Sequence, residues 1–414
     1  MTRFAKNLFR TQLCIFAVIF LPPIFFFFRY STSLAFGVLV ASVLIYILAP
    51  RKYVLTTLDL KILILVALVI LVHSFIVLGL MEFDIDRAIT SLALLLIVML
   101  AGMSLGRMML EMDQQLLNKV IQGCFLMLCI IGFLPYLNLQ LFEQTSNNFG
   151  YLKPFFPFVE PSHFALIFLP FILYGCSKNE GYKKYIPIIL GFIIGSLMQS
   201  MTLLAGCILI CLIFPSKSPK KFIVAAIVFG IFLFPMIDFS YYQARLPVSD
   251  EHTLNLSWLV FQQGWELIYE SIKSSIGFGI GFQQLGVNTG YEKIETSNLI
   301  NQLAGGYMNI LDGGFNLAKI VSEFGFLGAL LICFYIWISL RAILEINKKY
   351  NTTAQVFSCS ILVAYTVELF IRGVGYFSSN SIFLIAAFYI FWQSKVPRNK
   401  INPSHYLDLK NLEP

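Results

Sequence analysis

Long apolar stretches recur about a dozen times along this chain of 414 residues, and each is close to the length of a membrane span. A span needs about 20 apolar residues, and its backbone must satisfy its own hydrogen bonds within the lipid. We therefore predict an all-α fold, a polytopic integral membrane helix bundle with about 12 transmembrane helices. The predicted spans lie near residues 11–28, 32–49, 60–80, 88–105, 118–137, 159–176, 185–199, 201–215, 221–237, 319–340, 353–372 and 380–393.

The composition excludes a soluble protein. Hydrophobic residues make up 58% of the chain and charged residues 12%, and the mean hydropathy is +0.79. All eight cysteines lie in or beside apolar stretches, so the sequence indicates neither a disulfide framework nor a CxxC metal site. We expect a single membrane domain over residues 1–414, interrupted by one large polar loop over residues 238–318.

The positions of Lys and Arg predict the orientation, because cationic loops are retained in the cytoplasm. With a cytoplasmic N-terminus and about 12 spans, most cations fall on the inner side, both termini are cytoplasmic, and the large loop is periplasmic. The formal charge of +7 then reflects topology and anionic lipid, so we expect no nucleic-acid partner. The cations left on the outer side are Arg29, Arg87, Lys153, Arg245, Lys273, Lys293, Lys319 and Arg372.

Polar residues gather at the outer ends of predicted helices, and the first group is Glu160-Pro161-Ser162-His163. Proline after a polar residue is typical of a helix start, and the free N–H groups of such a start favour an anion. Glu160 and His163 are three residues apart and share one helix face. The group is either a helix cap or part of a catalytic or substrate-binding site, and ionisable groups at membrane depth favour the second interpretation.

Two further outer groups pair an acidic and a basic residue four positions apart. Glu368 and Arg372 either neutralise each other, or Glu368 holds Arg372 so that its guanidinium binds a phosphate. Lys319 and Glu323 repeat the spacing at the start of the tenth span, where an ion pair is the favoured interpretation.

The large loop contains aromatic and basic residues. It opens with Tyr241, Tyr242 and Arg245 and continues into a predicted amphipathic helix over residues 254–274 that suits the membrane interface. The glycine run over residues 277–281 predicts a tight turn rather than a nucleotide site. The segment 82–86, with three acidic residues, favours a polar hairpin tip over a cation site. His73 within the third span is open to either a structural or a pocket role.

These groups fit two classes of function. An enzyme that acts on a lipid-linked diphosphate needs a cation for its leaving group and a general base for the attacking hydroxyl. A transporter or flippase usually places its ionisable residues near the bilayer midplane and often shows an inverted repeat. Because the polar groups lie at the outer rim and no repeat is visible, the sequence favours the enzyme.

At several of these positions the chain resembles the O-antigen polymerases of the Wzy type. The resemblance covers about the central and C-terminal 250 residues. The motifs that carry it are Glu160-Pro161-Ser162-His163-Phe164-Ala165, Asn255-Leu256-Ser257-Trp258, Gln263-Gly264-Trp265-Glu266, residues 277–286, Asp312-Gly313-Gly314-Phe315-Asn316, Ser322-Glu323-Phe324-Gly325 and Arg372 in the penultimate helix.

The resemblance implies a GT-C-like glycosyltransferase of the bacterial inner membrane, with a periplasmic site and without a nucleotide-sugar site. We expect no cofactor, and the acidic loop around Asp84 and Asp86 leaves a metal requirement open. The enzyme would join undecaprenyl-diphosphate-linked repeat units and release undecaprenyl diphosphate. Membrane lipid and a chain-length regulator protein are the expected partners. The alternatives are an O-antigen ligase and a flippase or transporter for the lipid-linked oligosaccharide.

Our hypothesis for such an enzyme assigns roles to individual residues. Catalytic roles fall to Glu160 or His163 as the base and to Arg372, which together with Arg245 would bind the diphosphate. The residues expected to bind the substrate are Arg245, Tyr376, Tyr241, Tyr242, Trp265, Asn316 and Glu323.

Overall fold

A computed structural model describes residues 3–29, 33–50, 53, 55–134, 156–213, 256–287, 294–346, 348 and 351–394. Within these residues the regular structure is helical, as predicted. The helices are α1 (Arg3–Arg29), α2 (Ala35–Leu48), α3 (Thr57–Leu78), α4 (Ile85–Glu111), α5 (Gln114–Phe133), α6 (Pro161–Lys178), η2 (Gly181–Tyr185), α7 (Ile186–Leu197), α8 (Met201–Ile213), α11 (Leu256–Ser274), α12 (Glu295–Ala304), α13 (Asn316–Ile346), α14 (Thr353–Phe370) and α15 (Ser379–Gln393).

Six described helices are long and apolar enough to cross a membrane: α1, α3, α4, α5, α13 and α14. The shorter helices α2, α8 and α15 are also apolar. The fold is therefore compatible with a membrane helix bundle, while the total of about 12 spans stays a prediction. The predicted span over residues 221–237 lies outside the described residues.

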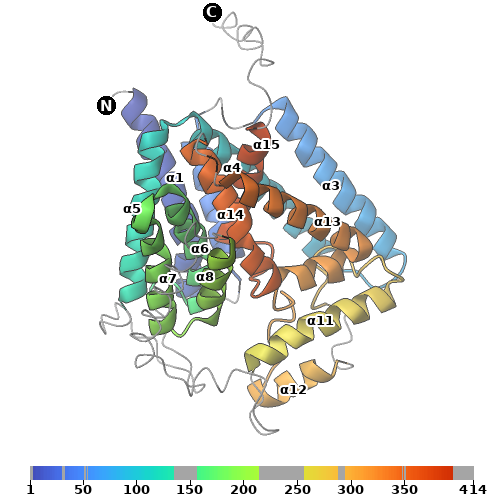
Figure 1. Cartoon of the computed structure of the whole chain (residues 1–414). Coiled ribbons are helices and arrows are strands. Elements are labelled where there is room, and N and C mark those ends of the chain that lie inside the picture. Colours follow the sequence, from blue (N-terminus) through green and yellow to red (C-terminus); the bar gives the residue numbers. More distant parts are fainter. Residues whose placement is uncertain are drawn as a thin grey trace, which may run out of the picture.

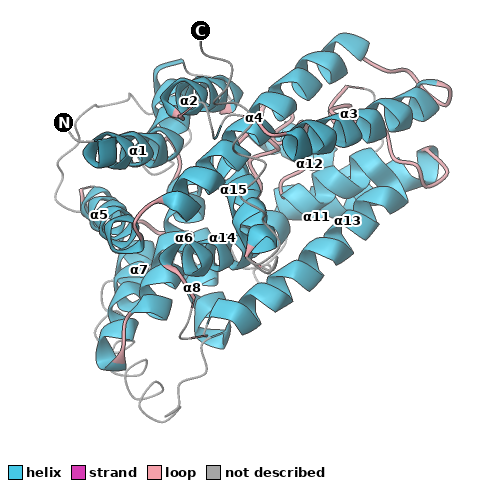
Figure 2. Cartoon of the chain, turned by 90° about the horizontal axis from the view of Figure 1, so that it is seen from above, coloured by secondary structure: helices cyan, strands magenta, loops and turns pink. Residues whose placement is uncertain are grey.

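Helix α6 forms the centre of the bundle and packs against α14, α8 and α7. Figure 2 shows α6, α14 and α15 between a group with α1, α2 and α5 and a group with α3, α11 and α13. Most side chains of α6 are buried, including Phe164, Phe168 and Phe171. Helix α6 is thus fixed by its neighbours over most of its length, so its first residues are held at one end of a packed core.

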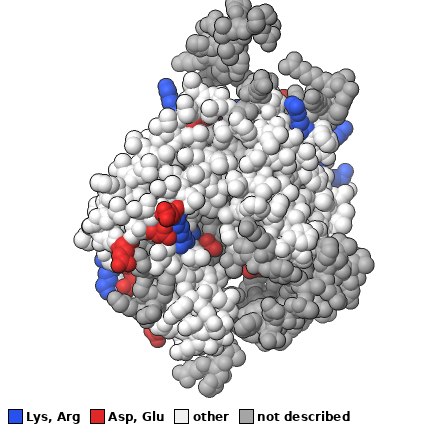
Figure 3. All heavy atoms as spheres, turned by 180° about the vertical axis from the view of Figure 1, so that it is seen from behind, with Lys and Arg blue, Asp and Glu red and all other residues white. Residues whose placement is uncertain are grey.

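The outer surface of the bundle is apolar. Helix α3 has only four buried residues, and it exposes 60% of Leu65 and 76% of Phe75. On the face shown in Figure 3, residues other than Lys, Arg, Asp and Glu form most of the described surface. Few charged residues on this face, together with the large exposed apolar side chains of α3, are compatible with lipid chains as the surrounding solvent.

An ion pair of Arg107 and Asp59 marks the end of the bundle where α3 begins and α4 ends. Both side chains are buried, and Arg107 also donates to the carbonyl oxygen of Tyr53 at 2.6 Å. Because α3 and α4 run antiparallel, the hairpin that joins them lies at the opposite end, where Asp84 caps α4 and its backbone N–H donates to Gln284 of the predicted loop.

The loop region contains two helices, α11 and α12, below the long helices in Figure 1. Helix α11 confirms the predicted amphipathic helix, and it buries Leu259, Val260 and Leu267 while Trp258 and Trp265 remain 43% and 48% exposed. Its position at a membrane interface stays a prediction.

Helix α13 is broken at Gly325, whose φ of 56° and ψ of −131° are not helical. The break leaves backbone carbonyl groups of α13 without partners in the helix, and the glycine run donates to them. The N–H of Ile280 donates to the carbonyl oxygen of Ser322, and the N–H of Gly281 donates to the carbonyl oxygen of Glu323, both at 2.9 Å. Glycines 277, 279 and 281 have positive φ, which confirms the predicted tight turn. The turn therefore anchors the loop region to α13.

We expect Gly279→Ala to destabilise the protein. A Cβ atom at Gly279 would lie 2.5 Å from both the Glu323 carbonyl oxygen and the Gly325 nitrogen, and the φ of +80° is unfavourable for alanine. The strained backbone alone costs about 1–3 kcal/mol. Thermal unfolding in detergent measures the loss, and Gly123→Ala, where a Cβ atom meets no neighbour within 4 Å, is the matched control.

Candidate functional site

Glu160 and Arg372 meet where α6 begins and α14 has ended. Glu160 is the N-cap residue of α6 and Pro161 follows at the first turn, so the predicted helix start is confirmed. The Glu160 carboxylate makes no capping hydrogen bond to its own helix. It accepts a hydrogen bond from Arg372 Nη2 at 3.1 Å instead. The side chain is therefore held by a residue from another part of the bundle as well as by its own helix.

Three polar groups converge on a single oxygen atom, Oε2 of Glu160. Besides Arg372, Ser162 donates its hydroxyl to Oε2 at 2.9 Å, and His163 Nε2 lies 3.9 Å away. The last distance is too long for a hydrogen bond but within the range of an ion pair for a protonated imidazole. Side-chain exposure is 44% for Glu160, 24% for Arg372 and 9% for His163. Glu160 is thus the acidic group that a ligand can reach.

The surroundings of Glu160 keep its carboxyl group ionised. Arg372 and Ser162 both donate hydrogen bonds to it, and such donors stabilise the charged form of a carboxylate. Glu160 is therefore a carboxylate at neutral pH, and in this arrangement it is a poor proton acceptor.

The expected pair of Glu368 and Arg372 is a prediction that the structure corrects. Helix α14 ends at Phe370, so Arg372 lies beyond the helix and does not share a face with Glu368. The Glu368 side chain is fully buried and accepts hydrogen bonds from Asn380 at 2.8 Å, Ser378 at 3.0 Å and Asn316 at 3.2 Å. Glu368 therefore acts within a buried polar network.

That network holds the segment that carries Arg372. Asn316 links Glu368 to the backbone N–H of Gly375, which donates to Asn316 Oδ1 at 3.2 Å. The N–H of Gly373 donates to the carbonyl oxygen of Gly314 at 2.9 Å. A Cβ atom at Gly373 would lie 2.5 Å from Asn316, so the two segments approach closely. Glu368 consequently fixes the backbone on which Arg372 is placed.

We expect Glu368→Ala to lower stability by about 1–3 kcal/mol, because buried donors on Asn316, Ser378 and Asn380 would lose their acceptor. Thermal unfolding of the purified protein measures the loss. Glu368→Gln keeps one acceptor oxygen and should lose less. Equal stability of Glu368→Ala and the unchanged protein would contradict this assignment.

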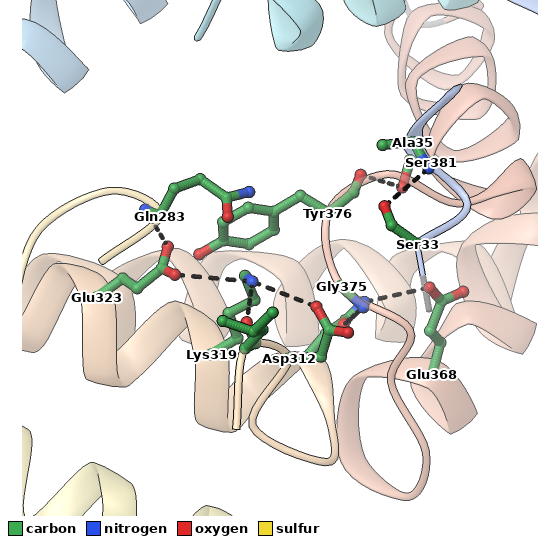
Figure 4. A network of polar contacts seen from close by, with 12 residues as sticks. Ser33, Ala35, Gln283, Asp312, Lys319, Glu323, Glu368, Gly375, Tyr376 and Ser381 are labelled. Carbon is green, nitrogen blue, oxygen red and sulfur yellow. Dashed lines mark hydrogen bonds and ion pairs between the residues drawn. The ribbon is translucent and has the colours of Figure 1, made fainter. Parts of the chain in front are cut away.

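A second charged cluster lies at the start of α13, and Figure 4 shows Lys319 between Glu323 and Asp312. The predicted pair is confirmed, since Lys319 Nζ lies 3.8 Å from Glu323 and 3.4 Å from Asp312. Lys319 is 2% exposed and Glu323 is fully buried, whereas Asp312 is 34% exposed. The Lys319 ammonium also lies 5.1 Å from the ring centroid of Tyr376. This cation is enclosed by its own partners.

The other predicted substrate-binding residues are placed as follows. Tyr376 stacks on Phe282 with ring centroids 5.7 Å apart, and Trp265 lies 5.3 Å from Phe315. Asn316 and Glu323 are fully buried and bonded to the protein itself. Arg245, Tyr241 and Tyr242 lie outside the described residues. The structure therefore brings Glu160, His163 and Arg372 together, and it gives Asn316 and Glu323 structural contacts.

Sequence reasoning did not select Asp312 or Ser162 as members of the site. Asp312 interacts electrostatically with His163, and it accepts from Lys319 at 3.4 Å. The signal for Asp312 was its position beside two glycines at a helix start, where acidic residues are common for structural reasons. Within the described residues, no cluster of three or more His, Cys, Asp or Glu side chains could hold a metal ion.

Comparison with known proteins adds no relative: no family model matches the chain, and no curated protein matches it.

Proposed function

We propose that the protein is an O-antigen polymerase, a membrane glycosyltransferase that joins undecaprenyl-diphosphate-linked repeat units. The observation that supports this most strongly is the ion pair of Glu160 and Arg372, two partly exposed side chains held at one end of an apolar helical bundle. The pair places a carboxylate, the type of group that can serve as a general base, beside a cation for a phosphate. These are the two groups that glycosyl transfer from a lipid diphosphate requires.

The proposed reaction is a single displacement at the sugar. A hydroxyl group at the non-reducing end of the incoming unit attacks the anomeric carbon of the growing glycan, and the bond from that carbon to the donor phosphate breaks. The hydroxyl proton passes to the Glu160 carboxylate. The electron pair of the broken bond leaves with undecaprenyl diphosphate, whose added negative charge Arg372 stabilises. Atoms and charge balance without a nucleotide or a metal.

Glu160 is the better base on structural grounds, because 44% of its side chain is exposed against 9% of His163. The His163 ring packs against Phe26 with centroids 5.5 Å apart, and its Nδ1 atom has no hydrogen-bond partner among the described residues. We therefore assign the base to Glu160 and place His163 as a buried neighbour of its carboxylate. Arg245 would supply a second cation for the diphosphate.

The proposal includes a topology. About 12 spans, cytoplasmic termini and a periplasmic loop over residues 238–318 would put the site on the periplasmic side of the bacterial inner membrane. Because α3 and α4 are antiparallel, the Arg107–Asp59 pair lies at one end of these helices and the contact with the loop region lies at the other, which supports this topology. Donor and acceptor lipids, and a chain-length regulator protein, are the proposed partners.

Deletion of the gene in its host tests this function. We expect the ladder of surface lipopolysaccharide on a gel to collapse to a single capped repeat unit, and the unchanged gene to restore it. Loss of every repeat unit, including the first, would contradict a polymerase and favour the ligase or flippase alternative. Glu160→Ala, tested at equal protein level, should fail to restore the ladder.

A further inference from the structure

Arg372 is the described cation of the site that a diphosphate can reach, yet its charge is already neutralised. Lys319 is 2% exposed and lies between Asp312 and Glu323. Arg372 is 24% exposed, and its Nη2 atom is 3.1 Å from Glu160 Oε2. A diphosphate that binds Arg372 must therefore compete with the Glu160 carboxylate.

The same contact limits Glu160. Its Oε2 atom accepts from Arg372 and Ser162 and faces His163, so the lone pairs of this oxygen are directed at the protein. A carboxylate in such contacts is stabilised in its charged form. As long as Arg372 stays paired with it, Glu160 is a weaker base toward a sugar hydroxyl than a free carboxylate.

We propose that the diphosphate of the donor displaces Glu160 from Arg372, and that this exchange of partners frees Glu160 to act as the base. The inference rests on the proposed function and adds an order to it: the donor engages Arg372 before the acceptor is activated. The base would then be available only when a leaving group is already in place.

The geometry permits the exchange at this pair and opposes it at the neighbouring one. Both members of the Glu160–Arg372 pair are partly exposed, so water can solvate Glu160 after separation at small cost. Separation of Lys319 from the fully buried Glu323 would leave an unpaired charge in the core. An arginine fork also binds two phosphate oxygens at once, which favours the diphosphate over one carboxylate oxygen.

Loss of the guanidinium charge would also restore basicity to Glu160. Arg372 donates to Glu160 Oε2 at 3.1 Å and so stabilises the charged carboxylate. When the diphosphate neutralises Arg372, Glu160 loses that stabilisation and becomes a stronger base.

The test measures binding of undecaprenyl diphosphate, the released product, to the purified protein in lipid nanodiscs. We expect Glu160→Gln to bind it about three- to tenfold more tightly than the unchanged protein, because the competing ion pair is gone. The same variant should form no polymer. Arg372→Gln should bind more weakly, and Glu82→Gln, an exposed carboxyl residue of the α3–α4 hairpin, should leave both binding and polymerisation unchanged.

Glu160→Asp gives a second measurement with the charge retained. Its carboxylate is one methylene shorter, so it should pair more weakly with Arg372, tighten diphosphate binding and keep residual transfer. If Glu160→Gln and Glu160→Asp bound undecaprenyl diphosphate no more tightly than the unchanged protein, the proposed exchange of partners would be wrong. Polymerisation by the unchanged protein would still support the proposed function. A protein that neither bound undecaprenyl diphosphate nor polymerised would contradict both.

Discussion

Arg372→Ala is expected to abolish long-chain polysaccharide, with a fall in transfer rate of about 10²- to 10³-fold. The reason is the loss of the cation that stabilises the departing diphosphate, at the position where Arg372 now contacts Glu160 at 3.1 Å. The measurement is the lipopolysaccharide ladder of a deletion strain that carries the variant, read together with the amount of the variant in the membrane.

Two further variants sharpen this result. Arg372→Lys should restore part of the ladder, because lysine keeps the charge but lacks the planar fork of arginine. Arg341→Ala, which removes an exposed arginine near the C-terminal end of α13, should restore the ladder fully. A normal ladder from Arg372→Ala at normal protein level would remove Arg372 from the mechanism.

Lys319→Met is expected to lower the free energy of unfolding by about 3–5 kcal/mol. The Lys319 ammonium lies 3.8 Å from Glu323 and 3.4 Å from Asp312, and the variant would leave the fully buried Glu323 without its cation. Methionine fills a similar volume, so the loss would come from charge rather than from a cavity. Thermal unfolding in detergent, with and without lipid, measures the change.

The double variant Lys319→Met/Glu323→Leu should recover much of this stability, because it removes the buried charge together with its partner. Lys348→Met is the matched control: Lys348 is 57% exposed and pairs with Glu345 at 2.8 Å, and loss of such a surface pair changes stability by about 1 kcal/mol or less. Equal losses of stability from Lys319→Met and Lys348→Met would contradict the burial of the cluster around Lys319.

Local patterns predicted much of the architecture. The apolar stretches that lie within the described residues form helices, Pro161 marks the start of α6, and the predicted helix over residues 254–274 corresponds to α11. The Lys319–Glu323 pair was also predicted, because both residues lie on one continuous turn of α13. Each of these features depends on residues close together in the chain, where spacing alone determines the contact.

The central contact of the site could not be predicted in this way. Glu160 and Arg372 are 212 positions apart, and their contact depends on how α6 and α14 pack. The spacing of Glu368 and Arg372 suggested a pair that the end of α14 at Phe370 prevents. Local spacing is informative only while the helix continues, and helix ends are the least certain part of a sequence-based prediction.

Burial distinguishes roles that the sequence left equivalent. Asn316 and Glu323 were assigned to substrate binding, yet both are fully buried and bonded within the protein. A polar residue in an apolar chain serves either function or structure, and its sequence position does not separate the two. Asn316 is better described as a positioning residue for the segment that carries Arg372.

Polymerisation by the purified protein, with lipid-linked repeat units as the sole substrates, tests the proposed function most directly. We expect glycans that lengthen by whole repeat units, with one undecaprenyl diphosphate released for each bond formed and no nucleotide sugar required. Folded protein that forms no product longer than one unit, together with a gene that restores no ladder in the deletion strain, would contradict this function.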